Sequence, residues 1–400
     1  MAMSINTNVV SINAQRNLAL SGGSLATSMQ RLSSGLRVNS AKDDAAGLAI
    51  AERMSTQVRG LAVASRNAND GISLAQTAEG ALGKVGDMLQ RMRELAVQAG
   101  NATNSKSDRE ALNAELVQLR DEVDRVAKTT SFNGKKVLDG SFTGGVFQVG
   151  ANSGDNITVG ALANTKVDQL GKTEFGTGSV TGITEGSKTD AASNMTNVDV
   201  TIVITGANQV SAQVTIAKDA DVTGDEALGR VVQAINSKTA DTGIVAFLAE
   251  DGKSIQYRAE KNADGVLANA TMAVSGGGST DVAALLANPT TPNTDQTGIH
   301  KMDIKTQAGA WESLQRIDSA LDKVSSARAE LGAIQTRFEK SIENIDIQQE
   351  NISAARGRIT DADFAQETAN LSRTQILQQA GTAMVAQANQ LPQQVLQLLQ

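Results

Sequence analysis

Residues 82–98 read LGKVGDMLQRMRELAVQ, and their apolar side chains recur every three or four positions. Because an α-helix turns once in about 3.6 residues, this spacing places the apolar side chains on one helix face. The face consists of Leu82, Val85, Leu89, Met92 and Ala96, continued backward by Ala75, Ile72, Ala68, Leu61, Val58 and Met54. The sequence therefore predicts one amphipathic helix from about residue 44 to residue 98.

Capping residues mark both ends of this helix. Ser40, Asp43 and Asp44 supply N-cap acceptors and first-turn acids, and Gly100–Asn101 supplies a left-handed stop. Such a helix is about 80 Å long at about 1.5 Å per residue, and it cannot bury its apolar face alone. A capping motif at Ser105–Asp108 introduces a second stripe. That stripe is Leu112, Leu116, Leu119, Val123 and Val126, so we expect an antiparallel helical hairpin.

A matching apolar stripe lies almost two hundred residues further along the chain. Its members, again three and four apart, are Leu314, Ile317, Leu321, Val324, Leu331, Ile334, Phe338, Ile342, Ile345 and Ile352. We infer that this helix and the N-terminal hairpin pack as one bundle, which brings the two chain ends together and makes the middle an insertion. Two separate coiled coils remain the alternative.

The middle of the chain, roughly 140–305, is rich in Gly, Thr, Ser, Asn and Asp and shows period-two patterns. Apolar residues alternate at Val198–Ile204 and Val210–Ile216, which predicts a hairpin with one buried face. A short helix around Leu228–Ile235 and further strands at Ile244–Leu248 and Ser254–Arg258 complete a ββαββ order. The glycine-rich tract that begins at Ser275 and ends at Asn293 is expected to be an exposed connector.

The composition excludes most classes of enzyme and ligand site. The chain has no cysteine and one histidine, His300, so Cys/His metal sites are ruled out and no catalytic site or cofactor is expected. The net charge is −7 without a polybasic run, which argues against nucleic-acid binding. No apolar run approaches the roughly 18 residues of a membrane span, and no general secretory signal precedes the first helix.

Both terminal segments are almost free of charge. Residues 1–30 contain only Arg16, and residues 374–400 contain no charged residue at all, yet both are amphipathic. Uncharged faces can pack against copies of the same chain without desolvating ions, which predicts self-assembly through the ends. The expected assembly residues are Ile5, Val9, Ile12, Leu25, Met29, Leu32, Leu377, Met384, Leu391, Val395 and Leu398. Gly22 and Gly23 should weaken the first helix until it is packed, and a head-to-tail contact that does not close would give a helical filament.

Five longer strings make the sequence resemble the bacterial flagellins across roughly residues 1–150 and 305–400. They are QRLSSGLRVNSAKDDAAGL (30–48), RNANDGISLAQTAEGAL (66–82), FNGKKVL (132–138), AARGRITDADF (354–364) and QQAGTAMVAQANQLP (378–392). The resemblance implies an α+β protein, mainly α at both ends, in which the N- and C-terminal segments form a long-helix coiled-coil bundle that carries a β-rich inserted outer domain.

The resemblance also implies a division into three parts. Residues 1–43 and 357–400 would be inner core helices that line the filament lumen as a terminal coiled coil. Residues 44–160 and 306–356 would form the long-helix bundle with a β-hairpin, and residues 161–305 the surface-exposed outer domain.

The implied function is that of a structural subunit, not an enzyme, which polymerises head-to-tail into the extracellular flagellar filament used for swimming. The resemblance further implies type III export with an export chaperone, and contacts with hook-associated and cap proteins. It also implies recognition of the monomer by Toll-like receptor five of animal hosts, with Arg91, Leu95 and Glu115 as the receptor-binding residues. No nucleic-acid or membrane partner is expected.

Two other functions compete with this one. A hook-filament junction protein would have similar ends but would not form long polymers by itself. A glycan-binding or hydrolytic module in residues 160–300, carried on the same scaffold, is the alternative from a different class.

Overall fold

The computed structural model describes residues 8–398 apart from gaps at 181–182, 184–187, 190, 193–198, 206–210, 218, 220–222, 250–251, 253, 260–270, 276–290 and 293–297. The chain divides into two compact units. The first unit holds the residues up to 71, residues 146–157 and the residues from 337 onward; the second holds residues 72–145 and 158–336. The part of the predicted connector between β10 (Thr271–Ser275) and β11 (Thr291–Pro292) lies outside the described residues.

The predicted long helix is α2 (Ala45–Ala99), which confirms both of its ends to within a residue. The Asp44 carboxylate accepts the Gly47 amide at 2.8 Å, as an N-cap should. The neighbouring Asp43 carboxylate accepts the Ser40 hydroxyl and amide, both at 2.9 Å. These bonds favour the charged form and hold the pKa of the Asp43 carboxyl below its ordinary value.

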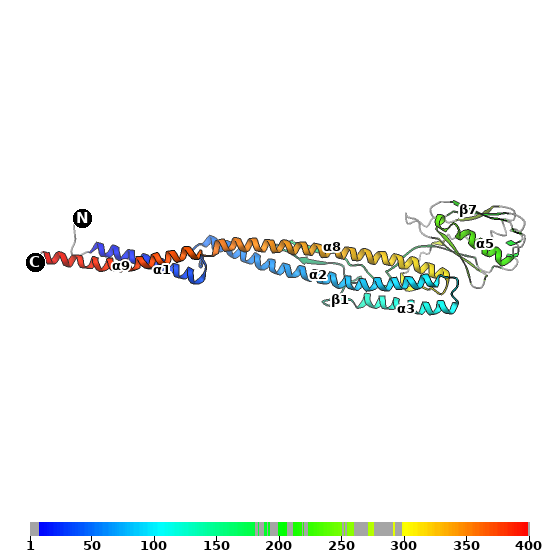
Figure 1. Cartoon of the computed structure of the whole chain (residues 1–400), viewed down its shortest axis with the longest axis horizontal. Helices are drawn as coiled ribbons and strands as arrows, with labels where there is room; N and C mark the ends of the chain where they lie inside the picture. The colour runs from blue at the N-terminus through cyan, green and yellow to red at the C-terminus, as the bar shows by residue number, and fades with distance from the viewer. Residues whose placement is uncertain are drawn as a thin grey trace. The chain divides into compact units, whose positions relative to one another are not determined.

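The second helix, α3 (Lys106–Thr129), begins at the predicted capping motif. Ser105 accepts the Asp108 amide, and Asp108 accepts the Ser105 amide at 3.0 Å, which makes a complete capping box. The Arg109 side chain donates to the carbonyl of Ala99 at 3.1 Å, so it satisfies a free carbonyl at the end of α2. The turn between the helices is therefore held from both sides, and α3 runs back beside α2 (Figure 1).

The third helix, α8 (Gln307–Thr360), carries the distant apolar stripe. In the second unit, the bundle core is built by residues of α2, α3 and α8, namely Leu82, Val85, Leu89, Met92, Leu116, Val123, Ile317 and Val324, each at most 2% exposed. An ion pair between Arg93 and Asp318 at 2.7 Å and a hydrogen bond from Gln335 to Glu79 at 2.7 Å link α2 with α8. The predicted single bundle is confirmed, and the alternative of two separate coiled coils is wrong.

In the first unit, the remaining parts of α2 and α8 pack around a short hairpin formed by β3 (Gly145–Gln148) and β4 (Asn156–Val159). The Phe147 ring meets the Phe338 ring edge-on, with centroids 5.4 Å apart and an interplanar angle of 83°. Phe338 is fully buried and lies against Gly71, where only a hydrogen atom fits. A second small hairpin, β1 (Ser131–Phe132) with β2 (Lys135–Lys136), follows α3.

The middle segment has the predicted order of elements, and its strands form two sheets. β6 (Val200–Thr205) and β7 (Ser211–Ile216) form the predicted hairpin, with Val200 opposite Ile216. β10 joins that hairpin to give a three-stranded sheet of order β10-β6-β7. β8 (Ile244–Leu248) and β9 (Ile255–Ala259) instead belong to a sheet of order β11-β5-β9-β8, where β5 is Gly176–Val180.

The predicted short helix is α5 (Gly224–Asn236), and α6 (Thr239–Thr242) follows it. α5 buries Leu228, Val231 and Ile235 in a core shared with Ile202 of β6 and Tyr257 of β9. His300 lies in the 3₁₀ turn η1 (Ile299–Lys301), where it is partly buried.

Candidate interaction surfaces

The charge-poor ends form two helices that pack along each other, α1 (Val9–Ser34) and α9 (Phe364–Leu398) (Figure 1). α1 starts at an N-cap, where the Asn8 side-chain oxygen accepts the Ser11 amide at 3.1 Å. It ends at Gly35, whose left-handed φ of 71° and amide bond to the Arg31 carbonyl terminate the helix. Packed against α9, α1 passes through Gly22 and Gly23 without a break.

The seam between α1 and α9 is lined mainly by small or polar side chains. The buried or half-buried positions on α1 include Ser11, Ala14, Leu18, Ser21, Leu25, Ser28 and Leu32, spaced by three and four. Those on α9 include Glu367, Leu371, Thr374, Gly381, Val385 and Ala388. The helices approach closely: a Cβ added at Gly381 would lie 3.0 Å from Leu18 Cδ1. This is the spacing pattern of a coiled coil.

The large apolar side chains of the same two helices mostly face away from the seam. Among the predicted assembly residues Val9, Ile12, Met29, Leu377 and Met384 are exposed by 49–62%. Val10, Leu20, Phe364 and Ile376 are exposed as well, by 55–66%. Sequence periodicity missed these four, although the absence of charge around them was a usable signal. The pair therefore leaves apolar side chains uncovered in the single chain.

The other predicted assembly residues are placed differently. Leu25 and Leu32 are half-buried in the seam and pack within the chain. Leu391, Val395 and Leu398 lie in α9, and Ile5 lies outside the described residues.

The predicted receptor residues lie on α2 and α3 in the second unit. Arg91 forms ion pairs with Glu94 and Glu115, both at 2.9 Å. Hydrogen bonds to Glu94 and then Glu115 raise the pKa of the Arg91 guanidinium above its ordinary value. Arg91 and Glu115 thus lie together on the surface, whereas Leu95 is only 1% exposed and faces the bundle core.

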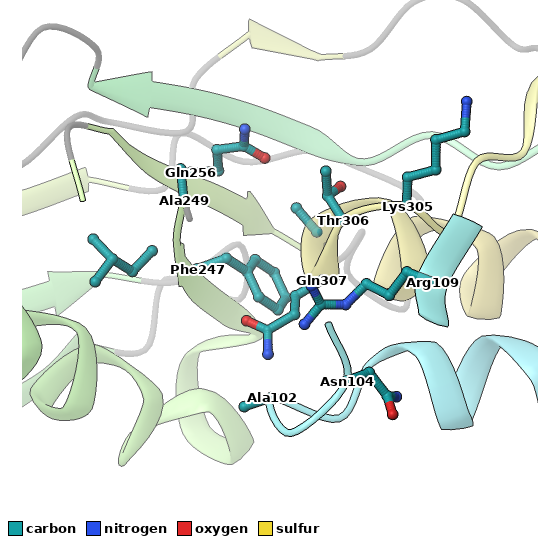
Figure 2. Close-up of a pocket in the computed structure, with 11 residues that line it drawn as sticks. Ala102, Asn104, Arg109, Phe247, Ala249, Gln256, Lys305, Thr306 and Gln307 are labelled. Atoms are coloured by element: carbon teal, nitrogen blue, oxygen red, sulfur yellow. The ribbon is translucent and has the colours of Figure 1, made fainter. Parts of the chain in front are cut away.

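The second unit contains a cavity of about 310 Å³. Its lining combines Arg109 and Lys305 with neutral side chains that include Phe247, Gln256 and Gln307 (Figure 2). Both ionisable side chains are cations, and Arg109 is engaged by the carbonyl of Ala99, so the cavity has no acid–base pair. Among the described residues no His, Asp or Glu side chains cluster as a metal site would require. No described helix is long and apolar enough to cross a membrane.

Comparisons with known proteins find matches at both ends of the chain and over its whole length. Residues 5–143 match the family model of the bacterial flagellin N-terminal helical region, and residues 314–399 match that of the C-terminal helical region. The chain is 44% identical over 410 residues to Flagellin A of Vibrio cholerae, covering 100% of both chains. It is 42% identical over 407 residues to Polar flagellin C of Vibrio parahaemolyticus, again covering 100% of both chains. The solved structure of FliC from Burkholderia pseudomallei matches 67% of this chain and 99% of its own at 25% identity, with a TM-score of 0.38.

Proposed function

The chain belongs to the bacterial flagellin family, and from this premise we propose which of its surfaces build the filament. Flagellins are structural proteins, not enzymes, and the chain is a subunit that self-polymerises into the extracellular filament used for motility. Relatives that match it over its full length are flagellins, which favours the filament subunit over the hook-filament junction protein.

The uncovered apolar side chains of the α1–α9 pair carry the proposal. Val9, Ile12, Met29, Leu377 and Met384 are exposed on helices whose polar faces are nearly free of charge. Neighbouring subunits can bury these side chains without desolvating an ion. Because about half of each side chain is still exposed, its burial contributes about 1–1.5 kcal/mol, half the value for full burial. The seam inside one subunit and the apolar faces between subunits therefore have separate roles.

This assignment fits the three-part division predicted from the sequence. Residues 1–43 and 357–400 would form the inner layer of the filament, and residues 44–160 with 306–356 the surrounding bundle. Residues 161–305 would face outward. Hook-associated and cap proteins, which meet the ends of the polymer, would contact the same inner and bundle surfaces.

Seeded polymerisation tests the role of the apolar faces. We expect Ile12→Ser and Met384→Ser each to raise the concentration of monomer left at equilibrium with filament by roughly tenfold or more. Gln387→Ser, at an exposed polar position of α9, is the matched control and should leave that concentration unchanged. Normal elongation by both apolar variants would refute the assignment.

We also propose that the monomer is exported by the type III route with a chaperone and is recognised by Toll-like receptor five. Arg91 and Glu115 would contact the receptor directly, because they are exposed and lie together. Leu95 is buried and would act by holding the surface of α2 in place.

Receptor binding by purified monomer separates these two roles. Arg91→Ala should weaken binding without changing the thermal stability of the monomer, whereas Leu95→Ala should lower both. Arg93→Ala removes a neighbouring guanidinium of similar exposure and serves as the control. Equal losses for Arg91→Ala and Arg93→Ala would contradict a specific contact.

A further inference from the structure

α9 contains a proline in its interior, and this creates a specific hydrogen-bonding problem. The helix continues from Phe364 to Leu398 through Pro392, which has no amide hydrogen. In an α-helix that hydrogen would bond to the carbonyl four residues earlier, which belongs to Ala388. Ala388 is only 4% exposed, so water has little access to the carbonyl that Pro392 leaves without a partner.

The missing donor comes from the other end of the chain. The Asn8 side-chain nitrogen donates to the Ala388 carbonyl oxygen at 2.8 Å. The side-chain oxygen of the same amide accepts the Ser11 amide at 3.1 Å and caps α1. One asparagine side chain therefore starts α1 and replaces the backbone hydrogen bond that Pro392 removes from α9.

A second contact reinforces this one on the next residue of α9. The Ser11 hydroxyl donates to the Asn389 side-chain oxygen at 2.8 Å, and Ser11 is itself buried. The two hydrogen bonds join the same turn of α1 to the same turn of α9. Together they fix how far one helix is shifted along the other at this end of the pair.

The opposite end of the pair is fixed by backbone bonds. The Arg37 amide donates to the Thr360 carbonyl at 2.7 Å, and the Ala362 amide donates to the Gly35 carbonyl at 3.0 Å. An isolated β-bridge joins Leu36 to Asp361. Along α1 the two fixed points, Asn8 and Leu36, are 28 residues apart, and along α9 Ala388 and Asp361 are 27 apart. The antiparallel helices are thus held at matching lengths.

Between these fixed points the seam offers little discrimination between alternative registers. Many of its side chains are small, and its leucines on α1, Leu18, Leu25 and Leu32, recur every seven residues, so a slip of one heptad would return leucine to leucine positions and change the packing only slightly. The chain has three prolines, and Pro392 is the one within α9. The Ala388 carbonyl is therefore the interior carbonyl of α9 that proline deprives of its backbone donor, and it distinguishes one position along the helix.

We propose that Asn8 determines the register of α1 against α9 by recognising the carbonyl that Pro392 leaves free. This inference rests on the proposed function, since it concerns the helix pair whose outer faces join neighbouring subunits. A shifted register would displace the apolar side chains of α1 from those of α9 and so spoil the surface that the next subunit must match.

A double-mutant cycle in the full-length chain tests the proposal. Asn8→Asp keeps an excellent N-cap but has no hydrogen to donate, and Asn8→Ser is an uncharged N-cap that is too short to span the contact. With Pro392 present, each variant should raise the residual monomer concentration in seeded polymerisation about tenfold. In a Pro392→Ala background, residue 392 again has an amide hydrogen for the Ala388 carbonyl. There the same two substitutions should change the residual monomer concentration by less than about twofold.

Hydrogen exchange in the polymer supplies a second, local measurement. Amides of residues 384–390 should lose protection in Asn8→Asp and regain it in Asn8→Asp combined with Pro392→Ala. If the two Asn8 substitutions raise the residual monomer concentration as much in the Pro392→Ala background as with Pro392 present, or have no effect in either background, the register role is overturned. Failure of the unmodified chain to elongate seeds would instead overturn the proposed function, so the two failures are distinguishable.

Discussion

Replacing Gly71 by alanine adds one carbon atom to α2 and tests how tightly the first unit is packed against it. A Cβ at this position of α2 would lie 2.6–2.9 Å from three ring carbons of Phe338. That ring cannot easily retreat, because it is fully buried and stands edge-on to Phe147 at 5.4 Å. Overpacking of this kind costs about 1–3 kcal/mol. The better helix propensity of alanine offsets this cost, because it stabilises α2 by up to about 1 kcal/mol.

Gly80→Ala is the matched control in the same helix. A Cβ at Gly80 meets nothing within 4 Å, so only the propensity gain applies, and α2 should become more stable by up to about 1 kcal/mol. The two alanine variants should therefore differ by about 1–3 kcal/mol, since both gain the propensity term and only Gly71→Ala carries the steric cost.

Native-state hydrogen exchange of the monomer, followed in peptides spanning residues 61–72 and 334–345, measures this difference locally. Gly71→Ala should exchange faster than the unmodified chain or at a similar rate, and Gly80→Ala should exchange more slowly. Adding Phe338→Leu to Gly71→Ala should remove much of the steric cost. If Gly71→Ala protects α2 as well as Gly80→Ala does, the close contact with Phe338 is not what requires glycine here.

Three further outcomes follow from the described contacts. Ser105→Ala removes the capping box of α3 and should destabilise that helix by about 1 kcal/mol, whereas Ser105→Thr should retain most of it; circular dichroism during urea unfolding measures both. Hydrogen bonds from Ser105 hold the pKa of the Asp108 carboxyl below its ordinary value of about 3.9. The stability that these bonds give the folded chain is therefore fully present above about pH 3.9, and it is lost as the pH falls through the pKa of Asp108 in the folded chain. Asp108→Asn should flatten this acid limb of the unfolding profile. Gly171→Ala should lower the melting temperature, because Gly171 has a φ of 69° and an added Cβ would lie 2.5 Å from the Arg316 carbonyl oxygen; unchanged calorimetric melting would contradict the clash.

Local signals explain why the long helices could be predicted closely from the sequence. Capping residues at Asp44 and Ser105 decide where α2 and α3 begin, and they act within a few residues of themselves. The two-sheet arrangement of the middle segment was not predictable in the same way. β5 reads GTGSV, a weak strand signal, and it pairs with β9 about 80 residues later, as in the Gly176–Ala259 pair.

The terminal helices show a different limit of sequence reasoning. Periodicity selected large apolar residues such as Leu377 and Met384 as assembly residues, but it did not identify the seam within the chain, which uses Thr374, Gly381 and Ala388. Small side chains carry little hydropathy signal, although they allow two helices to approach closely. The large side chains are spaced regularly because their proposed partners lie on other subunits, and a single chain cannot reveal those contacts.

The pairing of α1 with α9 also sets the order in which the chain can fold. Asn8 and Ala388 are separated by 380 residues, so their hydrogen bond is among the longest-range contacts the sequence can make. During synthesis α1 appears first but has no seam to pack on until residues 364–389 have followed. Loop closure over that length is slow unless the intervening bundle forms first and draws the ends together. Each subunit thus completes its terminal pair last, after the rest of its structure is in place.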